Sequence, residues 1–193
     1  MQAVTLPSGP IELDPAGQPH HDVWALLESV TDPEIPVVSL REMGILRAVR
    51  EGKNGLEVVI TPTYSGCPAM GQMEDDVKAA LAHAGVVARV VTQLAPAWST
   101  DWMTPQAHSK LRAYGIAPPP EGSAASACAH QTGAINVIQF APQKIARYAM
   151  PAVACPQCGS ENTTETSHFG STACKALYKC LDCLEPFDYF KPY

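Results

Sequence analysis

Two Cys-x-x-Cys pairs carry the clearest chemistry in this sequence. Cys155 and Cys158 form the first pair, and Cys180 and Cys183 form the second. Four thiolates presented by two short turns are the ligand set of a closed tetrahedral metal site. We therefore expect one structural Zn²⁺ bound by these cysteines, with iron as the alternative, because tetrathiolate sites accept both metals. Such a site stabilises a fold but leaves no open position for chemistry, so any functional site must lie elsewhere.

The segments around these pairs predict a zinc ribbon. Residues 162–167 and 175–179 have the composition of two short strands joined as a hairpin, and residues 187–190 can add a third strand. A unit of this size buries little core, so metal binding would supply most of its folding free energy, about 10 kcal/mol or more. Two disulfides are the alternative arrangement, and they would require an oxidising compartment.

Charge and cysteine content narrow the class of protein. The 193-residue chain has a net charge of −6 and seven cysteines, an odd number that suits a reducing compartment. Residues 1–22 lack a basic and apolar leader, and no apolar run approaches the roughly 18 residues of a membrane span. We expect a cytoplasmic protein without a membrane-spanning segment. The acidic balance also disfavours nucleic acid as a partner, because phosphate binding depends on Lys and Arg.

A second candidate for chemistry is the turn at residues 61–68, which reads Thr-Pro-Thr-Tyr-Ser-Gly-Cys-Pro. We expect Cys67 at the N-cap of the following helix, with Pro68 at its first position. The dipole of that helix would favour the thiolate form of Cys67. A buried structural thiol in a tight turn is the alternative interpretation.

Two carboxylates, Asp32 and Glu34, lie in a Pro-containing segment at residues 32–36. We expect a rigid, extended loop that presents both, and the alternative is an ordinary turn in which Asp32 caps nearby amides. The six histidines show no metal-ligand spacing, and the sequence has no phosphate-binding loop or nucleophile elbow. No catalytic residue is therefore assigned.

The pattern of apolar residues predicts an α+β fold that positions these side chains. Apolar spacing and turn signals indicate helices at 22–30, 70–84 and 105–114 and strands at 45–50, 56–61 and 86–94. A hairpin followed by a strand–helix–strand unit predicts a small mixed sheet with helices packed on it, followed by a C-terminal zinc-ribbon β domain. We expect a flexible leader at 1–19, a first domain at 20–115, a linker with a short strand near 136–140 at 116–150, and the ribbon at 151–193.

The order of these motifs resembles a known domain. A helix followed by Asp-Pro-Glu at 32–34, then a hairpin, then Thr-x-Thr-x-x-x-Cys-Pro at 61–68, resembles the SufT-like iron–sulphur assembly domain over Asp22–Val91. The resemblance implies that this domain handles iron–sulphur clusters. The positions that it marks as cluster-handling are Cys67, Asp32, Glu34, Thr61 and Thr63.

The rest of the chain resembles a narrower family. Segments 96–103, 110–119, 169–178 and 185–190 are similar to the PaaD family of phenylacetyl-CoA epoxidase (ring-oxygenase) systems. The resemblance implies an accessory maturation protein of aerobic phenylacetate degradation, and not an enzyme. Its expected task is assembly or insertion of the iron–sulphur (or iron) centre of the epoxidase complex. Its expected partners are the epoxidase components, above all the iron–sulphur reductase subunit.

Cys67 is the single thiolate predicted at this site, and this limits which iron species the site can bind. A single thiolate does not hold a cluster stably, so we expect a transient cluster or iron there, with further ligands from a homodimer or a partner. We expect Cys174 to be a small buried residue of the ribbon and not a metal ligand, and Cys128 has no assigned role. Two other functions stay open: a structural subunit of the complex, and a thiol enzyme using Cys67, for which no histidine close in sequence offers a base.

Overall fold

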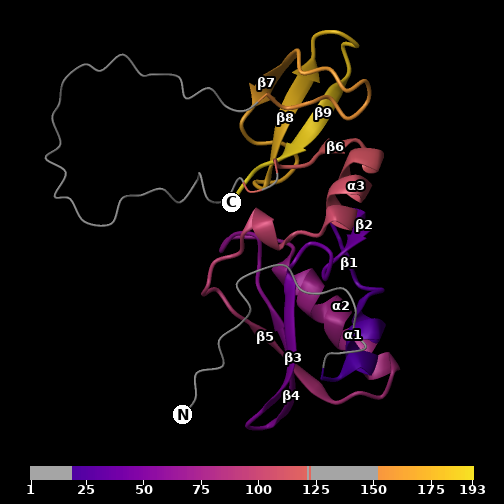
Figure 1. Cartoon of the computed structure of the whole chain (residues 1–193). Helices are drawn as coiled ribbons and strands as arrows, with labels where there is room; N and C mark the ends of the chain where they lie inside the picture. The colour runs from indigo at the N-terminus through magenta and orange to yellow at the C-terminus, as the bar shows by residue number, and fades with distance from the viewer. Residues whose placement is uncertain (1–18, 121, 123–151) are drawn as a thin grey trace, which may run out of the picture.

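Two units, stacked end to end, make up the described part of the chain (Figure 1). The structure is a computed structural model, and it describes residues 19–120, 122 and 152–193. The expected leader at 1–18, the expected strand near 136–140 and Cys128 lie outside the described residues. None of the helices in the described part has the length and apolar character that a membrane span requires.

A hairpin and a parallel strand share the sheet of the first unit. Strands β3 (Leu46–Gly52) and β4 (Gly55–Ile60) pair antiparallel, and Gly55 at their turn has φ +106°, which favours glycine. Helix α2 (Met70–His83) then crosses over to β5 (Ala88–Thr92), which pairs parallel with β4. The sheet is mixed, as the sequence predicts.

Helix α2 contributes one apolar face to the core of this unit. Its buried residues Met73, Val77 and Leu81 follow helical spacing. Helix α1 (His21–Leu27) buries Val23 and Trp24 in the same core. The apolar spacings in the sequence therefore mark the faces that are buried.

Residues 31–39 form a small hairpin and not the expected extended loop. Strand β1 (Thr31–Asp32) pairs antiparallel with β2 (Ile35–Ser39). The Asp32 carboxylate oxygen Oδ1 accepts hydrogen bonds from the backbone N–H of Glu34 at 2.7 Å and of Ile35 at 3.2 Å. These bonds close the turn between the strands, so the alternative interpretation, in which Asp32 caps nearby amides, is confirmed for this segment.

Helix α3 (Pro105–Tyr114) has the start and stop signals that its sequence predicts. The Thr104 hydroxyl accepts from the backbone N–H of Ala107 at 3.1 Å, and Pro105 opens the first turn. Gly115, with φ +94°, ends the helix. A single 3₁₀ turn, η2 (Thr100–Trp102), precedes it.

The second unit is a four-stranded ribbon. Strands β7 (Thr163–Ser167), β8 (Lys175–Cys180) and β9 (Pro186–Phe190) pair antiparallel in the order β9-β8-β7. Strand β6 (Ile116–Ala117), which directly follows α3, pairs parallel with β9. The sequence predicts that these two residues begin a linker, but they belong to the ribbon sheet. The predicted α+β class with a C-terminal ribbon domain is confirmed.

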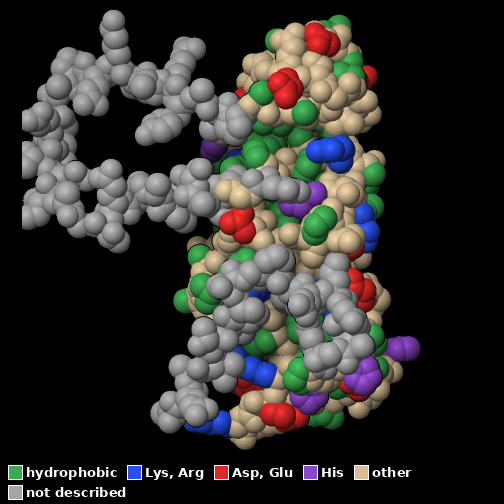
Figure 2. All heavy atoms as spheres, in the orientation of Figure 1, with side chains coloured by type: hydrophobic (Ala, Val, Ile, Leu, Met, Phe, Trp, Pro, Cys, Tyr) green, Lys and Arg blue, Asp and Glu red, His purple; other side chains and the backbone are tan. Residues whose placement is uncertain are grey.

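An aromatic seam joins the ribbon to the first unit. Phe190, at the end of β9, is 1% exposed and belongs to the core of the first unit. Its ring meets Trp98 edge-on with centroids 6.0 Å apart, and Tyr193 meets Trp98 at 6.3 Å. Figure 1 shows the ribbon at the end of the molecule beside α3. Figure 2 shows Lys and Arg interspersed with Asp and Glu on the described atoms in view.

Candidate functional site

The four ribbon cysteines converge on one point. Their sulphur atoms all lie within 4.8 Å of one another. Cys155 and Cys180 are buried, and the pairs Cys155–Cys183 and Cys158–Cys180 have Sγ–Sγ distances of 3.8 Å and 3.6 Å. The edge of a tetrahedron with Zn–S bonds of about 2.3 Å is about 3.8 Å. The donor set therefore fits zinc, which when bound would hold the ribbon together.

Backbone and side-chain hydrogen bonds hold the turns that carry the two Cys-x-x-Cys pairs in this geometry. The backbone N–H of Gly159 donates to the Cys155 carbonyl at 2.9 Å, with Gly159 in the left-handed region at φ +77°. The Asp182 carboxylate accepts from Asn162 Nδ2 at 2.7 Å and from the Ser160 hydroxyl. The backbone N–H of Cys183 donates to Cys180 Sγ at 3.5 Å, a bond that favours the thiolate form of a metal-binding cysteine.

A second group of chemically capable side chains lines a narrow cavity beside the aromatic seam. The cavity measures about 10 Å³, room for about one water molecule. Its walls come from the β1–β2 hairpin, the turn before α2 and the loop before β8. The lining residues are Asp32, Glu34, Ile35, Thr63, Tyr64, Cys67, Pro68, Ala69, Met73, Thr172, Cys174 and Phe190.

Four of the five residues that the sequence marks as cluster-handling line this cavity. Asp32 and Thr63 are buried there, whereas Glu34 is exposed at its edge. Thr61 does not line the cavity: it is buried, and its backbone N–H donates to the Ile45 carbonyl at 2.8 Å. Thr61 therefore lies in the core at the end of β4 and does not face the cavity.

The sequence prediction for the position of Cys67 is wrong in detail. The N-cap of α2 is Ala69, and Cys67 lies in the turn before it, where its backbone N–H donates to the Tyr64 carbonyl at 3.2 Å. An additional turn therefore separates the thiol from the helix. Burial raises the pKa of the Cys67 thiol above 9.0, the Ala69 N–H opposes this, and the negative charges of Asp32, Cys174 and Glu34 raise the pKa further. These shifts favour the protonated thiol, whereas the sequence predicts the thiolate.

Sequence reasoning missed Cys174 as a residue of this cavity. Cys174 comes just before β8, and its sulphur lies 3.0 Å from the Thr172 hydroxyl. It is outside the four-cysteine group, as the sequence predicts. Only the packing of the ribbon on the first unit brings it toward Cys67, and no local sequence signal reports such packing. Within the described residues, only the ribbon cysteines form a group of three or more potential metal ligands.

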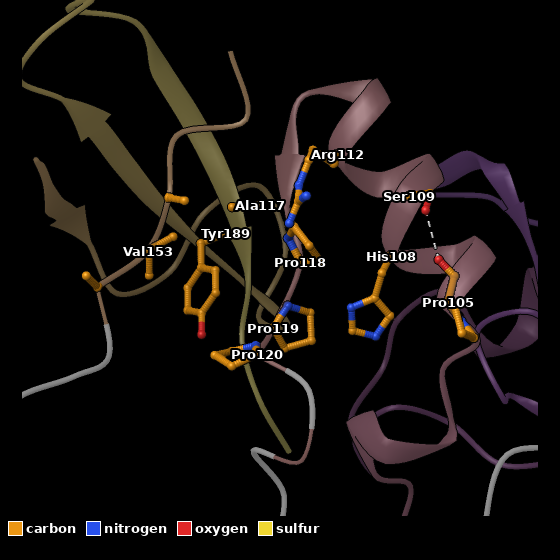
Figure 3. Close-up of a pocket in the computed structure, with 12 residues that line it drawn as sticks. Pro105, His108, Ser109, Arg112, Ala117, Pro118, Pro119, Pro120, Val153 and Tyr189 are labelled. Atoms are coloured by element: carbon orange, nitrogen blue, oxygen red, sulfur yellow. Dashed lines mark hydrogen bonds between the residues drawn. The ribbon is translucent and has the colours of Figure 1, made fainter. Parts of the chain in front are cut away.

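A larger cavity of about 560 Å³ lies between α3 and the ribbon (Figure 3). His108 and Arg112 of α3 line it opposite Tyr189 of β9, with Pro118 to Pro120 at its base. Burial raises the pKa of Tyr189 to about 12. The described residues that line this cavity include no cysteine or carboxylate, so it offers no soft ligand for iron.

Comparisons with known proteins agree with this two-part arrangement. Residues 20–92 match the model of the iron–sulfur cluster assembly protein family, and residues 140–191 match that of the PaaD zinc β-ribbon domain. A protein from Escherichia coli (strain K12), provisionally named as the D component of 1,2-phenylacetyl-CoA epoxidase, is 46% identical over 172 residues. The alignment covers 89% of this chain and 92% of that protein.

Two further proteins are similar to the first unit. An Fe–S protein maturation auxiliary factor from Porphyromonas gingivalis (strain ATCC BAA-308 / W83) is 32% identical over 97 residues, which cover 49% of this chain and 91% of that protein. Among solved structures, a domain of unknown function, DUF59, from Bacillus anthracis aligns with a TM-score of 0.43 and 32% identity, over 47% of this chain and 88% of that one.

The fold and the matched families define an iron–sulphur cluster assembly domain with an attached zinc ribbon. More narrowly, the chain belongs to the PaaD family of phenylacetyl-CoA epoxidase components, because its identity to the Escherichia coli protein extends over nearly the whole of both chains. The resemblance identified from the sequence is thereby confirmed.

Removal of the ribbon metal tests the structural role of the four cysteines. With a chelator, or in Cys158→Ser, the amides of β7, β8 and β9 should lose hydrogen-exchange protection, because metal binding supplies about 10 kcal/mol or more of the ribbon's folding free energy. Strands β3 to β5 should stay protected. Cys174→Ser is the control and should keep one metal per chain. Protected ribbon amides in metal-free protein would contradict the assignment.

The raised pKa of Cys67 predicts slow alkylation at neutral pH. Because the thiolate is the reactive form, the rate at Cys67 should keep increasing as the pH rises past 9.0, the ordinary thiol value. Asp32→Asn should lower this pKa and speed the reaction at pH 8, since the Asp32 charge raises it. Peptide mass spectrometry after iodoacetamide pulses measures the rate. Glu161→Gln, at the far end of the ribbon, is the control for a remote charge. An inflection below pH 9, or no effect of Asp32→Asn, would refute the electrostatic account.

Proposed function

We propose that this protein is a maturation factor whose Cys67 cavity receives iron, or an iron–sulphur cluster, as cargo. It passes the cargo to a component of the phenylacetyl-CoA epoxidase complex, and the expected recipient is the iron–sulphur reductase subunit. The observation that carries the proposal is the convergence of Cys67, Asp32, Glu34 and Thr63 on one cavity, separate from the closed ribbon site. Membership of the PaaD family and the match to the assembly family support it.

The cavity has the chemistry of a transient site. A soft thiolate and a hard carboxylate both bind ferrous iron, and Asp32 keeps one carboxylate oxygen, Oδ1, engaged with backbone amides. The Cys67 thiol must release its proton to bind a cation, and burial makes that release costly. Weak retention follows, which suits transfer to a recipient with a complete ligand set.

The ribbon has the opposite properties. Four thiolates would leave no open coordination position on a bound zinc, so that metal would stabilise the fold and not move. A thiol that binds iron at Cys67 must be kept reduced, which suits the cytoplasmic location expected from the sequence.

The competing function as a thiol enzyme has less support. A nucleophilic cysteine needs a base within hydrogen-bond reach, and the described lining of the cavity contains no histidine, so Asp32 or Glu34 would have to serve. The raised pKa of Cys67 also disfavours the thiolate, which is the nucleophilic form. A purely structural subunit would need no cavity of this composition, and the following experiment separates it from a maturation factor.

Complementation of a strain lacking this protein tests the proposal. Cys67→Ala should fail to restore growth on phenylacetate and should leave the reductase component deficient in iron and acid-labile sulphide. Asp32→Asn keeps the acceptor oxygen of the turn but removes the charge, and it should give a milder deficiency, as should Glu34→Gln. Cys128→Ala is the matched control and should restore growth. Full growth with a fully loaded reductase in Cys67→Ala would exclude the proposed role and leave the structural subunit.

A further inference from the structure

The cavity beside the aromatic seam contains two thiols, one from each unit. Cys67 comes from the turn before α2, and Cys174 comes from the ribbon loop before β8. The sequence alone predicts one thiolate at this site, with the further ligands supplied by a second copy of the chain or by a partner. In the folded chain, the ribbon places another thiol on the wall of the same cavity.

Several bonds fix the loop that carries Cys174. The backbone N–H of Lys191 donates to the Cys174 carbonyl at 2.9 Å, and the Tyr193 hydroxyl donates to the neighbouring Ala173 carbonyl at 3.1 Å. The sulphur itself lies 3.0 Å from the Thr172 hydroxyl. These contacts hold Cys174 against the first unit from both sides of the loop.

Electrostatic interactions among the lining residues indicate that the two thiols lie close to the same groups. Burial raises the pKa of Tyr64, and the charges of Cys67 and Cys174 raise it further. Asp32 has the same effect on each thiol: burial is the largest cause of the raised pKa of Cys174, and the Asp32 charge adds to it. The positive charge of Lys175, which is buried and paired with Asp188, acts in the opposite direction and lowers the pKa of both Cys174 and Asp32. The cavity therefore gathers three acidic groups beside one cation that is already paired.

Cys174 is too far from the ribbon metal site to serve it. Strand β8 runs from Lys175 to the ligand Cys180, and six residues of extended strand span about 20 Å. The ribbon metal and Cys174 therefore occupy opposite ends of β8. Ordering of the ribbon by its metal would fix the position of Cys174 at the far end.

We propose that Cys174 is the second thiolate of the cargo site, so that Cys67, Cys174 and Asp32 together bind one thiophilic divalent ion, such as ferrous iron, at the junction of the two units. This inference rests on the proposed function, and it adds a role for the ribbon beyond structure. A cavity of about 10 Å³ has room for a single ion. Each thiol releases its proton to water on binding, and no electron is transferred.

Cys67, Cys174 and Asp32 do not form a preassembled metal-binding group in this structure, so binding requires their side chains to move together. Both thiols are half-buried side chains in loops, where rotation about the side-chain bonds needs no change in the strands. An open arrangement of this kind suits an ion that must also leave.

Proximity of the two thiols is tested on the full-length, zinc-loaded protein. Dibromobimane, which links two nearby thiols, should join the peptide that contains Cys67 to the peptide that contains Cys174, because the ribbon cysteines are protected by zinc. Mass spectrometry of the wild-type chain identifies the link without any substitution. A link from Cys67 to Cys128 alone, or no link at Cys67, would overturn the inference.

Cobalt binding tests the shared coordination. Added to the zinc-loaded protein, Co²⁺ should produce a thiolate-to-metal charge-transfer band, and its intensity should fall about twofold in Cys67→Ser and in Cys174→Ser. Cys128→Ser is the matched control and should keep the full band. One zinc per chain after the titration, with unchanged ribbon hydrogen exchange, shows that each variant is folded and that cobalt has not replaced zinc.

The outcomes separate this inference from the proposed function. A band that is weakened by Cys67→Ser but untouched by Cys174→Ser would reject the role of Cys174 and leave Cys67 as the cargo ligand. A wild-type protein without any band would reject the two-thiolate site, whereas the proposed function is decided by complementation with Cys67→Ala.

Discussion

The packing of the ribbon's last strand on the first domain is the contact on which the rest of the structure depends. Phe190 lies in the core of the first domain although it belongs to the ribbon sheet, and Trp98 contacts both Phe190 and Tyr193. Strand β6 reinforces the junction, because it leaves α3 and pairs directly with β9. The two units are therefore one interlocked body, and the cavity at their junction exists only while both are folded.

This junction gives the two metal-binding arrangements different properties. The ribbon cysteines stand at tetrahedral spacing and leave no coordination position open. The Cys67 cavity has acidic groups that are not preassembled around one point, and burial and mutual repulsion raise the pKa values of its thiols. A closed site retains its metal, whereas an open and acidic one accepts a cation at the cost of proton release. One chain can thus combine a permanent structural metal with a transient cargo.

Local patterns in the sequence predict the elements well, and long-range packing accounts for what they miss. Apolar spacing locates α2 and α3, Gly115 marks the end of α3, and the two Cys-x-x-Cys pairs locate the metal site. Local patterns do not predict two short features. Strand β6 has only two residues, and the β1–β2 hairpin contains two prolines, which are uncommon in paired strands. The additional turn before α2, closed by a backbone bond from Cys67 to the Tyr64 carbonyl, displaces the thiol from the N-cap. Cys174 shows the limit most clearly, because Asp32 and Cys67, which line the same cavity, lie more than 100 positions earlier in the chain.

X-ray absorption at the iron edge tests the central claim most directly, namely that the junction cavity binds iron through thiolates of both units. The sample is anaerobic, zinc-loaded protein with one equivalent of ferrous ion, and its zinc content is measured before and after. The account predicts sulphur scatterers in the first coordination shell together with lighter oxygen scatterers, and loss of the sulphur signal in the double variant Cys67→Ser, Cys174→Ser. A first shell of oxygen and nitrogen alone in the wild-type protein would contradict it.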